Sequence, residues 1–135
     1  WGVSEGLDAP ETRDPTIAQN AHHLCLATLR RDGYVSLDAS LREGWIETKP
    51  LFSPGANLLI NGRCDPDGYI QAEIMDAQGN VLDEYSRENS EPFTGDSVKH
   101  RLKWSGRTTV NEIPGAVRPK FFLQKAELYG FQFVD

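Results

Sequence analysis

Apolar and polar residues alternate in short segments along most of the chain. Turn-forming stretches rich in Asp, Gly or Pro separate many of these segments. Alternation with a period of two residues is typical of β-strands that bury one face, and no segment has the longer period of a long amphipathic helix. The pattern predicts nine strands, at Leu24–Arg30, Tyr34–Ala39, Gly44–Thr48, Asn57–Asn61, Tyr69–Met75, Val81–Tyr85, Val98–Trp104, Arg118–Gln124 and Leu128–Val134.

The stretches between these segments have turn chemistry. Residues 31–33, 65–68 and 76–80 place Asp close to Gly. Asp side chains cap nearby backbone N–H groups, and Gly adopts positive φ, so these stretches predict hairpins or tight corners. We expect one helical turn at Val110–Ile113, and the longest irregular stretch at Ser86–Asp96.

The folded domain is expected to begin near His23. Residues 1–22 contain Pro10, Pro15 and several acidic residues without periodicity, which indicates a linker or a strap. Residues 23–135 would then form one all-β domain, an antiparallel two-sheet β-sandwich of the jelly-roll type.

Side chains two positions apart in a strand point the same way, so the strands also predict which residues form the core. Three rows are expected to face inward: Ile70, Ala72 and Ile74; Val98, Leu102 and Trp104; and Tyr129, Phe131 and Phe133.

Composition narrows the functional classes. The 135 residues have a formal net charge of −6, which disfavours a general nucleic-acid binder or a partner of anionic membranes. No stretch approaches a membrane span. Cys25 and Cys64 match no zinc or redox spacing, so they leave the disulfide state and the redox compartment undecided.

Several segments carry a resemblance to a known kind of domain. They are Leu29–Ala39, Thr48–Leu51, Leu58–Asn61, Gln71–Gly79, Thr94–Gly106 and Leu128–Phe133. Together they span roughly residues 24–135 and resemble the C-terminal β-sandwich domain that follows glycosidase-like β-propellers. The resemblance implies a non-catalytic accessory domain of a larger secreted or surface protein, extracellular, with polysaccharide or oligosaccharide and a neighbouring domain of the same protein as partners.

Two other functions stay open. The domain would buttress a neighbouring propeller without binding sugar, or it would be a glycoside hydrolase fragment that contributes a loop such as Ser86–Asp96 to a shared site. Independent catalysis is disfavoured, because no nucleophile, base and stabiliser group together. His100 falls on a core-facing row and is interpreted as a buried histidine.

Metal binding is a weaker hypothesis. Most of the turn aspartates are explained as turn formers, and no cofactor is expected. Calcium is the alternative, because several turn carboxylates and carbonyls together can satisfy a hard cation. Asp38, Asp96 and Asp135 are the candidate ligands.

Two surfaces are candidates for a glycan. Trp45 alternates with Glu43 and Glu47, so it is expected to point outward and to stack on the apolar face of a neutral sugar. A second, cationic stripe would bind acidic sugars through bidentate hydrogen bonds, with an aromatic and an amide beside it. Its candidate residues are Lys99, Arg101, Lys103, Arg118 and Lys120, with Tyr69 and Gln71. Glutamates across the strands would alternatively neutralise this stripe.

Overall fold

A computed structural model describes residues 25–52, 55–110 and 113–135 of the chain. The predicted linker, residues 1–22, lies outside the described residues. The strands are β1 (Leu37–Ala39), β2 (Gly44–Glu47), β3 (Leu51–Phe52), β4 (Asn57–Asp76), β5 (Asp96–Arg101) and β6 (Ala116–Val134), and two short 3-10 helices are η2 (Asp83–Tyr85) and η3 (Arg87–Asn89).

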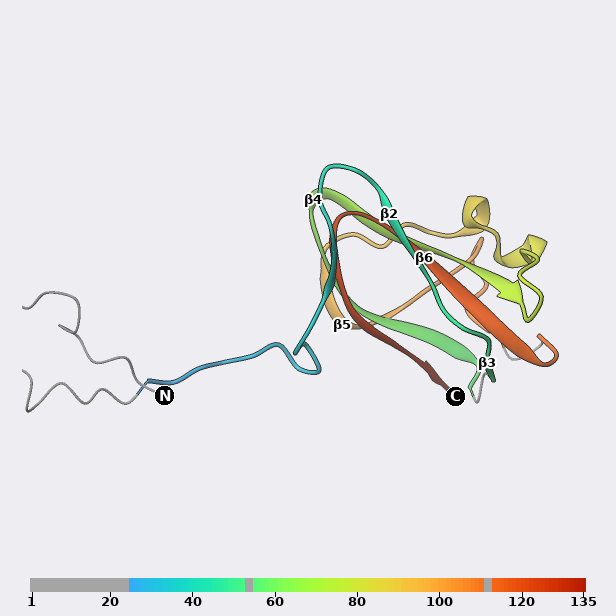
Figure 1. Cartoon of the computed structure of the whole chain (residues 1–135), viewed down its shortest axis with the longest axis horizontal. Helices are drawn as coiled ribbons and strands as arrows, with labels where there is room; N and C mark the ends of the chain where they lie inside the picture. Colours follow the sequence, from blue (N-terminus) through green and yellow to red (C-terminus); the bar gives the residue numbers. More distant parts are fainter. Residues whose placement is uncertain (1–24, 53–54, 111–112) are drawn as a thin grey trace, which may run out of the picture.

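Two long antiparallel strands, β4 and β6, form the centre of the fold (Figure 1). On the far side of β6 from β4, the short strands β1, β2 and β3 follow one another along its edge, and β5 pairs with the first part of β4. The all-β prediction is therefore confirmed. A sandwich of two separate sheets is not confirmed, because hydrogen bonds join the described strands into one six-stranded sheet.

The sheet turns a corner halfway along β4 and β6. Cys64 pairs with Ala126 and Tyr69 with Gln124, so residues 65–68 of β4 lie opposite Lys125 alone. Extra residues on one strand bend it and increase its twist. The sequence correctly predicted a corner at residues 65–68, but the chain continues through it as one strand instead of reversing.

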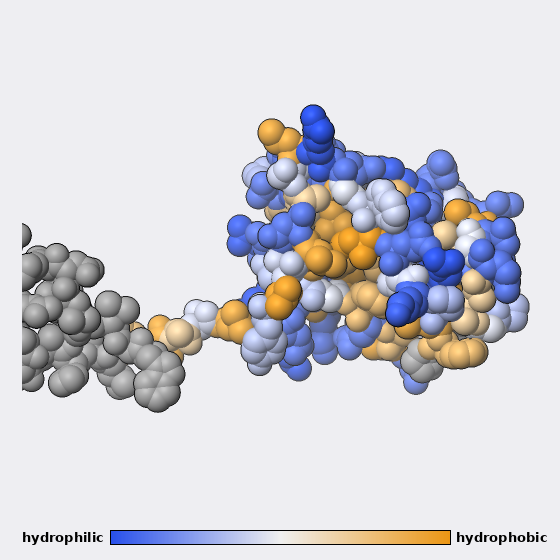
Figure 2. Space-filling view, viewed as in Figure 1, coloured by the Kyte–Doolittle hydropathy of each residue, from blue (hydrophilic) through white to orange (hydrophobic). Residues whose placement is uncertain are grey.

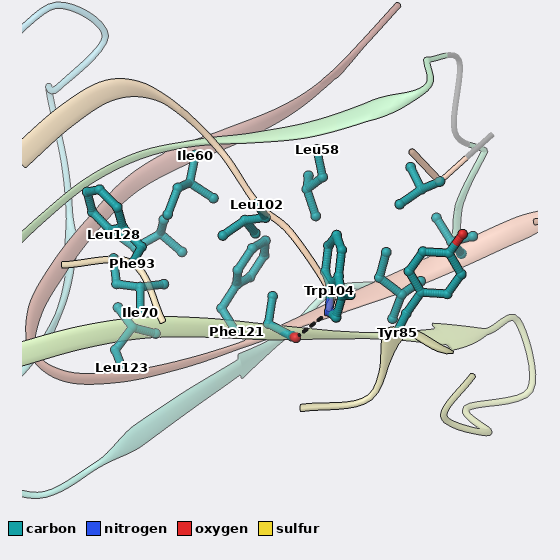
Figure 3. Close-up of a cluster of buried hydrophobic side chains, with 14 of the residues drawn as sticks. Leu58, Ile60, Ile70, Tyr85, Phe93, Leu102, Trp104, Phe121, Leu123 and Leu128 are labelled. Carbon is teal, nitrogen blue, oxygen red and sulfur yellow. Dashed lines mark hydrogen bonds between the residues drawn. The ribbon is translucent and has the colours of Figure 1, made fainter. Parts of the chain in front are cut away.

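The two halves of the bent sheet pack against each other. Phe121, from the half that contains β2, has its ring centroid 5.1 Å from that of Phe131, from the half that contains β5. Figure 3 shows the resulting core, in which the Trp104 ring lies edge-on to Tyr85 and its Nε1–H donates to the Ala72 carbonyl oxygen at 2.9 Å. Burial of these apolar side chains is the main stabilising contribution to the fold.

Most of the predicted core rows are correct. Ile70, Ala72 and Ile74 are completely buried. Phe131 and Phe133 pack on the core. Tyr129, which was predicted to share their face, does not, because the register against β4 shifts by one residue there and Leu128 takes its place.

Three other local predictions were wrong. Val98 is exposed because the register between β4 and β5 shifts just before His100, which changes the direction of the side chains. Leu24–Arg30 was predicted to be a strand, but its described part, 25–30, pairs with no described neighbour. Val81–Tyr85 forms one bridge and then η2, since Asp83 and Glu84 interrupt the apolar pattern.

Candidate functional site

The outer face of the sheet carries an exposed tryptophan among paired charges. Across β2, β6 and β4 the register aligns Trp45 with Phe122 and Gln71, and Glu47 with Lys120 and Glu73. Phe121 and Leu123 are buried in the core. Successive residues of a strand point to opposite faces, so Phe122 and the residues at two-residue spacing from it on β6 point away from that core. We call this surface the Trp45 face; it comprises Glu43, Trp45, Glu47, Tyr69, Gln71, Glu73, Arg87, Arg118, Lys120 and Phe122.

Trp45 is supported from one side and open to solvent. The Lys120 Nζ atom lies 5.1 Å from the Trp45 ring centroid and 5.0 Å from that of Phe122. Lys120 is itself fixed by an ion pair with Glu73 at 3.3 Å. A cation over an aromatic face is attracted by the ring quadrupole, so these contacts restrain the indole. The residue is nevertheless 62% exposed.

A second cluster borders the tryptophan. Both terminal nitrogens of Arg87 donate to the carboxylate of Glu43, one of them at 3.0 Å, and the Tyr69 hydroxyl donates to the same carboxylate. The Arg87 hydrogen bonds, followed by that of Tyr69, hold the pKa of Glu43 below its usual range. The Arg87 guanidinium also stacks over the Phe122 ring at 4.3 Å. This packing and the bidentate pair fix a planar group beside Gln71.

The segment between η3 and β5 holds Arg87, the first residue of η3, over the sheet. Ile70 and Phe93 exchange two backbone hydrogen bonds, at 2.9 and 2.8 Å, so this loop runs along the edge of β4. The Ala72 N–H donates to Ser90 Oγ at 3.1 Å, and Gln71 Nε2 donates to the Ser90 carbonyl oxygen at 3.0 Å. These bonds take the place of a strand beyond Tyr69 and hold η3 against the Trp45 face.

Each cation of the Trp45 face has a glutamate partner. Arg87 pairs with Glu43, Lys120 with Glu73, and Arg118 with Glu47. The face therefore presents an aromatic ring, amide and hydroxyl groups and neutralised ion pairs. Such a surface offers apolar contact together with many donors and acceptors, and carries little net charge.

The structure gathers only part of the predicted glycan-binding set. Trp45, Tyr69, Gln71, Arg118 and Lys120 meet on the Trp45 face. The other predicted cations, Lys99, Arg101 and Lys103, are exposed on or just after β5, which pairs with β4 before the corner. The predicted continuous cationic stripe is therefore not assembled.

The predicted glycan-binding set lacked Glu43, Glu47, Glu73, Arg87 and Phe122 of this surface. Phe122 follows buried Phe121 directly, so a strict alternation would have assigned it to the outer face. Glu43 is recognisable from its spacing of two from Trp45. Arg87 has no such signal, because it reaches the sheet from η3, 44 residues after Glu43 in the chain.

The candidate calcium ligands lie apart. Asp38 is paired in register with Glu127, Asp96 forms an ion pair with Arg30, and Asp135 follows the last residue of β6. Among the described residues, no group of three or more His, Cys, Asp or Glu side chains is arranged to hold a metal ion.

The remaining side chains with reactive groups, His100, Cys64 and Cys25, differ in how far they are buried. The His100 ring packs on Phe93 with centroids 4.4 Å apart, and burial, followed by the charge of Lys103, lowers its pKa. Burial raises the pKa of the Cys64 thiol to about 11, which leaves it protonated at neutral pH. Cys25 is exposed and not in a disulfide.

Within the described part of the chain, no helix has the length and apolar character that crossing a bilayer requires. Comparisons with protein-family models, with curated proteins and with solved structures found no match to this chain.

Proposed function

We propose that this chain is a sandwich-like, non-catalytic accessory domain of a larger carbohydrate-active protein, and that it binds polysaccharide through the Trp45 face. One observation carries the proposal: an indole restrained by Lys120 but 62% exposed stands on a sheet face with fixed hydrogen-bonding groups around it. An exposed large aromatic side chain that is held in place by its neighbours supports a binding role more than a core role.

Pyranose rings fit this combination of groups. Their C–H faces are apolar and pack on an indole ring, while their hydroxyls donate and accept hydrogen bonds around the rim. Gln71, Tyr69 and Glu43 lie on the same face as Trp45, at the positions where rim contacts would form. Because Lys120 restrains the ring, little side-chain entropy would be lost on binding.

The charge pairing favours a neutral sugar at this face. An acidic sugar would have to compete with Glu43, Glu73 and Glu47 for the cations that they already neutralise. Replacing an intramolecular ion pair by an intermolecular one gains little, and the displaced carboxylate would repel the ligand. We therefore assign neutral polysaccharides to the Trp45 face.

A second candidate function uses β5. No described acidic residue forms an ion pair with Lys99, Arg101 or Lys103, and all three are exposed. Uronate or sulfate groups would suit these cations, with an affinity that falls as salt rises.

Affinity gel electrophoresis of the chain separates these functions, with neutral and uronate-containing polysaccharides in calcium and in chelator. We expect retardation by a neutral polysaccharide, and Trp45→Ala should weaken it at least about tenfold through loss of the stacking area. Phe52→Ala is the matched control, because Phe52 is an even more exposed aromatic residue, 83%, at the β3 edge.

Each outcome decides between the candidates. Neutral binding that survives Trp45→Ala would place the glycan elsewhere and overturn the assignment to this face. Binding only to uronates that Arg101→Ala abolishes would favour β5. Failure to bind any polysaccharide would favour a buttress for a neighbouring domain, for which the exposed Leu37, Leu41 and Phe52 of the sheet edge would be the contact.

A further inference from the structure

The last part of β6 has an open edge. On the side away from β4, β1 pairs with Ala126–Leu128, and β2 and β3 pair with earlier residues. No strand pairing from a described residue reaches residues 129–134 on that side. An open strand edge presents unpaired N–H and C=O groups and is a template for the addition of another strand.

An apolar groove of about 370 Å³ lies beside this edge. Its apolar lining includes Val35, Leu37, Ile46, Phe121, Leu128 and Phe131. Figure 2 shows hydrophobic surface in the middle of the face on which β2 and the end of β6 lie. Part of the core is thus accessible where the next strand of the sheet would stand, so a strand added here would also bury apolar surface.

The chain contains an apolar segment that has no strand partner among the described residues. Residues 25–29, Cys-Leu-Ala-Thr-Leu, have the composition of a strand, but they pair with no described residue. Leu26 is 91% exposed and Leu29 is 62% exposed. Figure 2 shows hydrophobic residues in the narrow segment that enters the body of the domain. Exposed apolar side chains that lie close together often mark a site of protein–protein interaction.

The segment leaves the domain beside the open edge. Arg30, the next residue, donates to Asn61 Oδ1 at 2.6 Å and to the Gly62 carbonyl oxygen at 3.1 Å, and it pairs with Asp96. Its guanidinium lies 4.8 Å from the Tyr129 ring centroid. The origin of the segment is therefore fixed next to the first residue of the open edge.

We propose that two copies of this chain form a dimer by exchanging residues 25–29, each segment adding as a strand to residues 129–134 of the other copy and covering its groove. Five extended residues span about 17 Å, which matches an open edge of six residues. Because the donor segment and the acceptor edge lie together, a twofold axis lets both exchanges form at once, as an isologous interface requires.

Sequence favours this occupant over the beginning of the same chain. Residues 1–20 contain Glu5, Asp8, Glu11 and Asp14 and two prolines. Acidic side chains would be desolvated in an apolar groove, and proline removes a ladder hydrogen bond. Residues 25–29 have neither a charge nor a proline.

Light scattering coupled to size-exclusion chromatography tests the dimer on the full chain. We expect the mass of two chains over a range of concentrations. Leu26→Asp combined with Leu29→Asp on the donor, or Leu37→Asp on the acceptor, should each raise the dimer dissociation constant more than about tenfold. Phe52→Asp is the matched control, because Phe52 is exposed on the same sheet edge but does not line the groove, and it should leave the dimer intact.

A mixing experiment distinguishes exchange from general apolar association. The donor variant and the acceptor variant each lack both contacts as homodimers, but a mixed pair keeps one unmodified segment on one unmodified groove. Mixing them should therefore restore dimers that neither variant forms alone. A monomeric unmodified chain, a dimer that resists both variants, or failure of the mixture to associate would each overturn the exchange. The glycan-binding result does not bear on it, since Trp45 does not line the groove.

Discussion

The side chain of Trp104 combines the largest apolar surface of the core with a polar nitrogen. Its ring is buried beside Tyr85, and its Nε1–H donates to the carbonyl oxygen of Ala72 at 2.9 Å. Trp45 has the same chemistry on the outer face, where the indole is open to water. The alternation of the sequence assigned the two tryptophans to opposite sides correctly, because Trp45 lies within β2 and Trp104 keeps the alternation from His100 and Leu102, beyond the register shift of β5.

We predict that Trp104→Phe lowers the free energy of unfolding by about 2 to 4 kcal/mol. The substitution removes buried volume and leaves the Ala72 carbonyl without its indole donor. Chemical denaturation, with unfolding monitored by circular dichroism, measures the change in the free energy of unfolding. Trp45→Phe is the control and should change stability by less than about 0.5 kcal/mol, because the ring is mostly exposed. Equal losses from the two substitutions would contradict the core assignment of Trp104.

Arg87 marks the limit of sequence reasoning at this scale. Its partner Glu43 directly precedes β2, whereas Phe122 lies on β6 and Gln71 on β4. Periodicity describes neighbours within one strand, and no local pattern reports which loop folds back over a sheet. The part of the Trp45 face on the strands was therefore predictable, whereas the contribution of Arg87 from η3 was not.

At the scale of elements, β4 and β6 are each one strand where the sequence suggested two. The stretches 65–68 and 125–127 interrupt the alternation, and an interruption is compatible with either a hairpin or a bulge. The number of residues on the partner strand decides between them, and this is a tertiary property. Here four residues oppose one, and the left-handed conformation of Lys125, with φ of 46°, accommodates the difference.

Gly68 should be essential to this corner. A Cβ atom at this position would lie 2.2 Å from the Lys125 carbonyl oxygen and 2.8 Å from that of Gln124, so the backbone of one strand would have to shift. We predict that Gly68→Ala destabilises the fold by about 1 to 3 kcal/mol, as overpacking does. Gly130→Ala, on the same pair of strands with open space at its Cβ position, should be nearly neutral in the same denaturation assay. A neutral Gly68→Ala would mean that the corner is looser than described.

At the scale of the whole molecule, the net charge is −6, and several of the acidic residues in the described part of the chain form ion pairs. Glu43, Glu47 and Glu73 neutralise the cations of the Trp45 face, while Asp96 and Asp67 neutralise Arg30 and Lys125. Carboxylates that are paired in the folded state lose this stabilisation when they are protonated, so the fold should be acid-sensitive.

Glu43 offers the clearest test of that acid sensitivity. Arg87 and Tyr69 hold its pKa below the usual range in the folded state. The unfolded chain therefore binds the proton more readily as the pH falls, so the contribution to stability is present above the ordinary carboxyl pKa and is lost as the pH falls through the folded one. We predict that Glu43→Gln reduces the loss of stability between about pH 5 and about pH 3, measured by urea unfolding at each pH.

Arg87→Gln should flatten the same part of the pH profile, because Arg87 is the principal cause of the lowered pKa of Glu43. The double variant should then lose little more than either single one, since the two side chains act through one interaction. Full additivity would mean that Glu43 and Arg87 stabilise the fold independently. In that case η3, which carries Arg87, would not be anchored to the sheet by this pair, and the border of the Trp45 face would have to be held by the stacking on Phe122 and the Ser90 hydrogen bonds.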